Sequence, residues 1–188
     1  MVHGFGSQWQ VRDEQGRRKY LNEREGLAFL AVADRLPAAY RTLCYVLAYT
    51  GCRISEALAL SPYHLDTDQL TVTFKTLKRR RTVFRVVPIP PDLMQALRDL
   101  AQPGGSRLWS VHRTTAWRVV KRAMEQAGIE GPMACCRGLR HGFGIRATSR
   151  SVPANIVQRW MGHASLATTS VYLDAVGAEE RAFAKRTW

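Results

Sequence analysis

Residues 157–172 read VQRWMGHASLATTSVY, and this stretch decides how the fold is interpreted. Its apolar positions up to Trp160 predict one face of a helix, and Gly162-His163 predicts the corner that ends it. Ser165 suits the N-cap of a second short helix, which carries Tyr172. A histidine and a tyrosine at this spacing are common half-buried residues, so the stretch indicates a function only together with the residues upstream of it.

The composition indicates one globular, strongly basic domain. The chain has 188 residues, with 28 Lys+Arg against 15 Asp+Glu, a formal net charge of +13 and 46% hydrophobic residues. A chain of this length folds as one domain. A basic surplus of this size makes nucleic acid the first partner to consider, and solubility is the alternative explanation.

Membrane and metal partners are not expected. No uncharged apolar run approaches the roughly 20 residues that span a bilayer, and the first ten residues lack the apolar stretch of a signal peptide, so a cytoplasmic location is expected. The cysteines have no CxxC spacing and are expected to be free thiols, and they form no zinc-ligand pairs with the histidines. These cysteines are Cys44, Cys52, Cys135 and Cys136.

A helix is predicted to begin close to residue 22. Asn22 and Glu25 have the spacing of a capping-box variant, with Asn22 as the N-cap. Leu27, Leu30 and Ala31 recur at helical spacing, so we expect them to form the buried stripe of this helix.

The next helix ends at a charged corner. Apolar residues between positions 40 and 48 fall at i, i+3, i+4, i+7 and i+8, and Gly51 ends the helix. Arg53 follows at the start of another short helix, in which Ile54 and Leu58 are able to face the core. A fixed positive charge is therefore expected at a structured corner.

Residues 70–89 change to the alternating pattern of strands. Segments 70–74 and 83–89 are rich in β-branched residues, and the basic run Lys75–Arg81 lies between them, so we predict a β-hairpin with a densely positive turn. A helix restarts between Leu93 and Leu100. The whole pattern predicts a mainly α fold with a small antiparallel β-sheet, of the α+β class.

Two further segments concentrate positive charge. A helix from about Thr114 to Ala127 has a basic face that is either solvated or in contact with phosphates. Downstream, Arg137 and Arg140 are three positions apart, so in a helix both guanidinium groups lie on one side and favour a nearby anion. The first 21 residues form an arm, either solvated or in contact with DNA, whose basic residues include Arg12, Arg17, Arg18 and Lys19.

The motifs, taken in chain order, resemble those of a known family. The sequence contains TGCRISEAL at 50–58, a lysine at the hairpin, GLRH at 138–141, Gly162-His163, and two threonines before Tyr172. This arrangement resembles the tyrosine recombinases of the phage integrase family over residues 22–176. It implies the catalytic-domain fold of that family, with residues 1–21 as a basic arm and residues 177–188 as a helical tail that packs on a neighbouring protomer.

The resemblance implies cleavage and rejoining of DNA strands by a recombinase of bacterial or mobile-element origin, associated with the nucleoid. Tyr172 would form a 3′-phosphotyrosyl intermediate. Arg53 and Arg140 would clamp the non-bridging phosphate oxygens, where negative charge gathers in the transition state. The protein–DNA link conserves the bond energy, so neither ATP nor a metal cofactor is implied.

Other residues take supporting roles by the same resemblance. Lys75, which fits better than Lys78, would protonate the leaving 5′-oxygen. His163 would hydrogen-bond the scissile phosphate, and Glu56 would support the Arg53 helix. The expected DNA contacts are Lys78, Arg79, Arg80, Arg81, Arg118, Lys121 and Arg122.

One position departs from the family pattern. Three residues before Arg140 the family usually has a histidine, a candidate general base, and here Arg137 stands there. Arginine stays protonated, so it cannot accept the proton of Tyr172, although it can contact phosphate and favour the phenolate. His141 lies about 100 degrees round the helix from Arg140, and a packed, hydrogen-bonded histidine is its simpler interpretation. We therefore expect a slow recombinase. The sequence does not identify the general base that accepts the proton of Tyr172.

The partners and alternatives follow from the same resemblance. The 21 residues before Asn22 are too few for the separate core-binding domain of related recombinases. We therefore expect modest, salt-sensitive binding to double-stranded DNA, with an accessory DNA-binding protein as a candidate helper. A homo-oligomer on DNA, tetrameric in the family, is expected. The alternatives are nicking and relaxation, as in type IB topoisomerases, and a DNA-binding accessory protein without efficient turnover.

Overall fold

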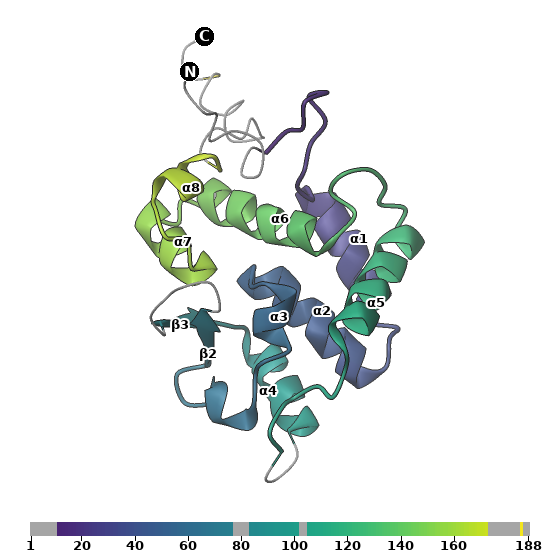
Figure 1. The fold of residues 1–188 in the computed structure, drawn as a ribbon, viewed down its shortest axis with the longest axis vertical. Helices are drawn as coiled ribbons and strands as arrows, with labels where there is room; N and C mark the ends of the chain where they lie inside the picture. The colour runs from purple at the N-terminus through teal and green to yellow at the C-terminus, as the bar shows by residue number, and fades with distance from the viewer. Residues whose placement is uncertain (1–10, 77–82, 102–104, 173–184, 186–188) are drawn as a thin grey trace.

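The computed structural model describes residues 11–76, 83–101, 105–172 and 185. The fold is mainly helical with a small antiparallel sheet, which confirms the predicted α+β class (Figure 1). The elements are α1 (Glu23–Ala33), α2 (Ala38–Thr50), α3 (Ile54–Ala57), the 3₁₀ helix η1 (Pro62–His64), β1 (Leu65–Asp66), β2 (Thr71–Thr76), β3 (Val83–Pro88), α4 (Pro91–Leu100), α5 (Arg113–Gln126), α6 (Cys136–Ser149), α7 (Ala154–Met161) and α8 (Ala167–Ser170).

Helix α1 begins as predicted but buries a different face. The Asn22 side chain accepts a hydrogen bond from the Glu25 N–H, and the Glu25 carboxylate accepts one from the Asn22 N–H. The predicted stripe is wrong at Leu27, which is 64% exposed, and at Ala31, which is also exposed, whereas Leu30 packs against the core as predicted. Phe29 and Ala33 are fully buried instead. The helical spacing allowed either face, and the packing of α1 against α2, α5 and α6 selects the face with the aromatic ring.

Helix α2 ends at the predicted corner. Gly51 has a φ of 60°, a left-handed conformation that glycine adopts without strain, and its N–H bonds to the Leu47 carbonyl. A Cβ at position 51 would lie 2.6 Å from the Phe143 ring, so the turn also needs the missing side chain. Arg53 then forms the N-cap of α3, and Ile54 is buried as expected.

The hairpin is confirmed, and a short third strand extends it. The sheet has the order β1-β2-β3 with both pairs antiparallel, and Lys75 lies opposite Phe84 in the β2–β3 register. Along β2, Phe74 and Thr76 are buried while Lys75 is exposed, which follows from the two-residue period of a strand. The turn residues 77–82, which include Lys78, Arg79, Arg80 and Arg81, lie outside the described residues.

The helices surround α2, which packs against α1, α4 and α6. Figure 1 shows α6 crossing above α2 and α3, with α5 beside α1, and α7 lying between α6 and the sheet. Helix α7 contacts α6, α8 and β3, so it joins the helical part of the molecule to the sheet. None of the described helices is long and apolar enough to cross a membrane.

The C-terminal part of the described chain forms a smaller second core. Val157, Met161 and Tyr172 pack there against Phe143 and Ala147 of α6. Gly162 ends α7 with a φ of 65°, as the sequence predicted. The N-cap of α8 is Leu166 instead of Ser165, whose hydroxyl accepts a hydrogen bond from the Ala167 N–H. The predicted tail, residues 177–188, lies outside the described residues apart from Lys185.

Two glycine substitutions should separate backbone strain from packing. Gly51 and Gly128 both have a positive φ, but a Cβ at position 128 would meet nothing within 4 Å. We expect Gly128→Ala to lower the free energy of unfolding by about 1 kcal/mol, and Gly51→Ala by about 2–4 kcal/mol because the added methyl also overlaps Phe143. Urea unfolding of both variants measures this, and equal losses would contradict the tight contact at Gly51.

Candidate active site

The first part of the site is a buried carboxylate at the corner after α2. Glu56 is 1% exposed, and its two oxygens accept hydrogen bonds from the Arg53 side chain at 2.9 Å and the Arg53 N–H at 2.8 Å. Burial by itself raises the pKa of the Glu56 carboxyl, but Arg85 and Arg53 outweigh this and leave the pKa below its ordinary value. Glu56 therefore stays ionised and binds the Arg53 guanidinium.

Arg85 of β3 also binds this carboxylate, and sequence reasoning missed it. Its Nη2 lies 2.7 Å from Glu56 Oε2, and the arginine is 5% exposed. The missed signal is that Arg85 shares the two-residue period of Val87 and Ile89, both buried, so it lies on the inner face of an alternating strand.

Arg140 joins the ends of two helices. Its Nη1 donates to the Gly51 carbonyl and its Nη2 to the Met161 carbonyl, both at 2.7 Å. These carbonyls use two of the five guanidinium N–H groups, which leaves three for an anion. Burial, followed by the charge of Arg53, lowers the pKa of Arg140 to about 10, so it remains charged at neutral pH.

His163 lies at the corner between α7 and α8. It is 4% exposed, and its Nδ1 lies 2.8 Å from the hydroxyl oxygen of Thr169, which is itself fully buried. Burial, with Arg140 and Arg53 nearby, lowers the pKa of His163 to about 3. The imidazole is therefore neutral at pH 7.

Tyr172 is buried, and its hydroxyl contacts His141. The tyrosine is 2% exposed, and its Oη lies 3.1 Å from His141 Nδ1. The ring packs on the backbone of α6, because a Cβ at Gly144 would lie 2.6–2.8 Å from ring carbons of Tyr172. Burial raises the pKa of Tyr172 to about 12, against the opposing effect of Arg140 and Arg53.

His141 is the packed, hydrogen-bonded histidine that the sequence favoured, and its partner is the tyrosine. It is 1% exposed, and its Nε2 is buried without a hydrogen-bond partner among the described residues. Burial, and then the charges of Arg140, Arg137 and Lys19, lower the pKa of His141 to about 4. The sequence could not supply this contact, because 31 positions separate the two residues.

Two of the predicted residues lie outside this buried cluster. Lys75 points to solvent on the sheet face opposite to Phe74 and Thr76. Arg137 is exposed near the start of α6, whereas Arg140, one turn later, is buried, so the two guanidinium groups do not share one environment as expected. Arg53, Glu56, Arg140, His163 and Tyr172 are thus brought together, with Arg85 and His141 added.

The predicted basic face of α5 lies at the surface. Arg118 and Arg122 are exposed and Lys121 is half-buried, while Ala116 and Val120 face the core as expected. Next to them Trp117 is 46% exposed. This face is therefore open to a partner.

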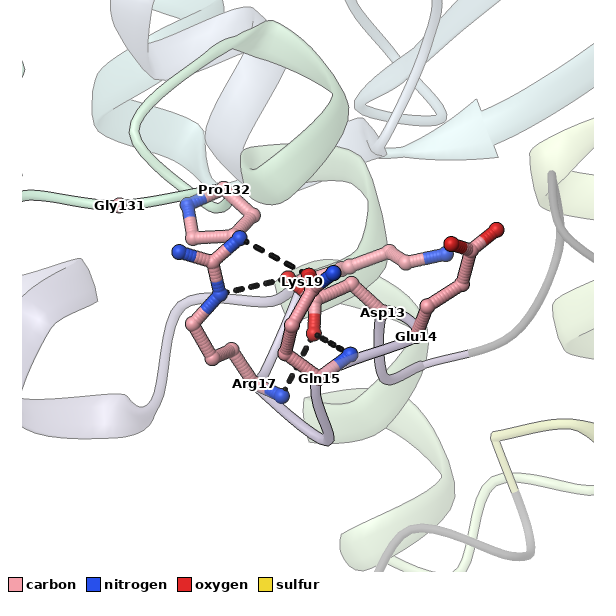
Figure 2. Close-up of a pocket in the computed structure, with 7 residues that line it drawn as sticks. All are labelled: Asp13, Glu14, Gln15, Arg17, Lys19, Gly131 and Pro132. Atoms are coloured by element: carbon pink, nitrogen blue, oxygen red, sulfur yellow. Dashed lines mark hydrogen bonds and ion pairs between the residues drawn. The ribbon is translucent and has the colours of Figure 1, made fainter.

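An open hollow elsewhere on the molecule contains none of the predicted catalytic residues. It has a volume of about 530 Å³ and lies between residues 13–19 and the Gly131-Pro132 loop (Figure 2). Arg17 pairs there with Asp13 at 2.7 Å, so these two charges neutralise one another. Among the described residues no group of three or more His, Cys, Asp or Glu side chains could hold a metal ion.

Comparison with known families gives the class of protein. Residues 19–178 match the model of the phage integrase family, so the chain belongs to that family. It is 32% identical over 151 residues to the tyrosine recombinase XerD of Mycobacterium leprae, covering 70% of this chain and 46% of that protein. It is 25% identical over 166 residues to the tyrosine recombinase XerA of Pyrococcus furiosus, covering 82% and 56%. The chain spans about half the length of the curated relatives it matches.

Solved structures show the same fold. A crystal structure of XerA recombinase superposes with a TM-score of 0.76 at 22% identity, covering 89% of this chain and 64% of that one. XerH recombinase bound to its difH substrate gives a TM-score of 0.73 at 21% identity, covering 93% and 59%. The catalytic domain of bacteriophage HP1 integrase gives 0.64 at 26% identity, covering 87% and 92%. The fold is therefore that of tyrosine recombinase catalytic domains.

Acid should destabilise the protein through His141 and His163, which are buried among the described residues. The pKa is about 4 for folded His141 and about 3 for folded His163, against an ordinary value of 6.5. Below pH 6.5 the unfolded chain binds protons that the folded chain does not. The free energy of unfolding therefore decreases as the pH is lowered. We expect a loss of about 2 kcal/mol per histidine between pH 7 and pH 5, measured by urea unfolding.

The control is a histidine at the surface. His141→Asn should remove about half of this pH dependence, whereas His112→Asn, at the exposed N-cap of α5, should keep all of it. An unchanged pH dependence in His141→Asn would contradict a neutral, buried His141.

Proposed function

We propose that this chain is the catalytic part of a site-specific DNA recombinase that cleaves and rejoins strands through a phosphotyrosyl intermediate at Tyr172. The observation that carries the proposal is the buried cluster itself, in which Tyr172 lies within the electrostatic influence of both Arg53 and Arg140. A tyrosine whose pKa two nearby arginine charges act to lower suits attack on a phosphodiester, because the same guanidinium groups can stabilise the phenolate and the phosphate oxygens.

The charge of the cluster favours an anion. Arg53, Arg85 and Arg140 face one buried carboxylate, Glu56, which leaves a surplus of two positive charges in a largely buried region. Arg140 keeps three N–H groups after binding its two carbonyl partners, and the Arg53 side chain is 23% exposed. We assign the non-bridging oxygens of the scissile phosphate to these two arginines.

The tyrosine must move before it reacts. Its side chain is 2% exposed, so a phosphodiester cannot reach the hydroxyl in this arrangement. Transfer of its proton to His141 is also unfavourable here, because burial raises the pKa of Tyr172 to about 12 and lowers the pKa of His141 to about 4. Deprotonation therefore follows release of Tyr172 toward the arginines and the DNA, and His141 holds the resting hydroxyl.

The remaining steps involve groups at the surface. Lys75, exposed near the end of β2, is our candidate to protonate the leaving 5′-oxygen once DNA lies over the hairpin. Arg137 is exposed and permanently charged, so it can contact a phosphate but cannot act as the base. We expect slow turnover because Arg137 cannot accept the proton of Tyr172. His163, which is neutral, is our candidate to hydrogen-bond the scissile phosphate.

The partner that fits this chemistry is double-stranded DNA. The exposed basic face of α5, with Arg118, Lys121 and Arg122, supplies backbone contacts, and the basic hairpin turn supplies others. We expect a homo-oligomer on DNA with an accessory DNA-binding protein as a candidate helper. XerH, a structural relative, is solved in complex with its DNA substrate, which supports this choice of partner.

A covalent trap tests the proposal. The substrate is a pool of nicked duplexes of randomised sequence. Cleavage close to the nick releases a short fragment that carries the 5′-hydroxyl needed for rejoining, so the protein stays attached to the DNA. The attached duplexes can then be sequenced. We expect an adduct with the wild-type chain and at least about a 10³-fold loss with Tyr172→Phe, which lacks the nucleophile. Denaturing gels of radiolabelled DNA measure the adduct.

The matched control is a second tyrosine. Tyr63 is 89% exposed and outside the cluster, so Tyr63→Phe should form the adduct at the wild-type rate. An equal yield from the wild-type chain and Tyr172→Phe would contradict the proposal. Binding without any adduct would favour the alternative of a DNA-binding accessory protein.

A further inference from the structure

Arg85 uses all three of its guanidinium nitrogens to join separate elements. Nη2 binds Glu56 Oε2 at 2.7 Å, Nε donates to the Trp160 carbonyl at 2.7 Å, and Nη1 donates to the Thr76 hydroxyl at 3.3 Å. Its guanidinium carbon lies 4.9 Å from the centre of the Phe74 ring. Because Arg85 is 5% exposed, it cannot contact DNA in this structure.

Two of these contacts, with Glu56 and with the Trp160 carbonyl, lead to residues of the proposed site. Glu56 also binds the side chain and the N–H of Arg53, so the position of its carboxylate sets the orientation of that arginine. Trp160 lies three residues before His163, and a Cβ at Gly162 would lie 3.2 Å from Arg85 Cδ and Nε, so the His163 corner packs directly on the Arg85 side chain.

The chemistry of arginine explains why one side chain can do this. Its planar fork donates in several fixed directions, whereas lysine has a single ammonium group. A buried ion pair is a weak source of stability, because the desolvation of both charges offsets their attraction. Stability alone is therefore a poor explanation for Arg85, and the fixed placement of its three partners is a better one.

We propose that Arg85 is a positioning residue for DNA cleavage, which orients Arg53 through Glu56 and places the His163 corner through the Trp160 carbonyl. This inference rests on the proposed function. It predicts that loss of Arg85 impairs charge stabilisation at the scissile phosphate more than it impairs DNA binding.

The test compares two scissile linkages. Single-turnover cleavage at saturating DNA is measured on a duplex recovered by the covalent trap, with either the normal phosphodiester or a methylphosphonate, in which a methyl group replaces one charged oxygen. Arg85→Met should cleave the phosphodiester at least about 100-fold more slowly than wild type. Its dissociation constant for DNA should change by less than about threefold. On the uncharged methylphosphonate the difference should shrink to less than about tenfold, because less negative charge then needs Arg53.

Two further variants keep the test decisive. Arg85→Lys retains the charge but not the fork, so its cleavage rate should lie between those of wild type and Arg85→Met, and it decides the test if Arg85→Met does not fold. Arg146 is the matched control: it donates to the Ala48 carbonyl at 2.7 Å, and its guanidinium carbon lies 5.9 Å from the centre of the Phe143 ring. Neither Ala48 nor Phe143 is one of the proposed catalytic residues. Arg146→Met should show the wild-type rate on both substrates.

Two results would overturn the inference. A loss of the same size on both linkages would make Arg85 a residue of the fold only, and an unchanged rate in both Arg85 variants would remove any role in cleavage. A wild-type chain that cleaves neither duplex would instead overturn the proposed function, and this inference with it.

Discussion

The ionic contact between Glu56 and two arginines is the constraint on which the site depends. A carboxylate that is 1% exposed is stable only if its oxygens are fully hydrogen-bonded, and Arg53 and Arg85 provide those bonds. Arg53 belongs to the corner after α2, and Arg85 belongs to β3 and also binds the end of α7. One carboxylate therefore fixes three elements that are distant in sequence.

Arg140 makes a second connection between the same regions. Its hydrogen bonds to the carbonyls of Gly51 and Met161 join the end of α2 to the end of α7. Arg53 comes two residues after Gly51, and His163 comes two residues after Met161. The arginines held by the helices and the sheet thus form a positively charged site for the phosphate. Tyr172, in contrast, is attached through the four-residue helix α8. This contrast suits a reaction in which the phosphate site is preformed and the nucleophile moves into it.

Local sequence signals predicted the parts of the fold that local physics decides. A glycine after an apolar helix located the corner before Arg53, and alternating β-branched residues located the hairpin with Lys75. Signals that depend on tertiary packing were harder to interpret. The spacing in α1 allowed two faces, and Leu27 was placed on the wrong one. The partner of Arg85 lies 29 positions away and that of His141 lies 31, so neither contact was accessible without the fold.

Tyr172 is the residue that we expect to become joined to DNA, and mass spectrometry of the trapped adduct identifies the joined residue. Trypsin releases residues 160–181 as one peptide, in which Tyr172 is the only tyrosine beside several serines and threonines. After nuclease digestion, we predict that fragmentation of this peptide places the remaining nucleotide on Tyr172. A nucleotide on a serine or threonine of this peptide, or on any other peptide, would show that Tyr172 is not the nucleophile.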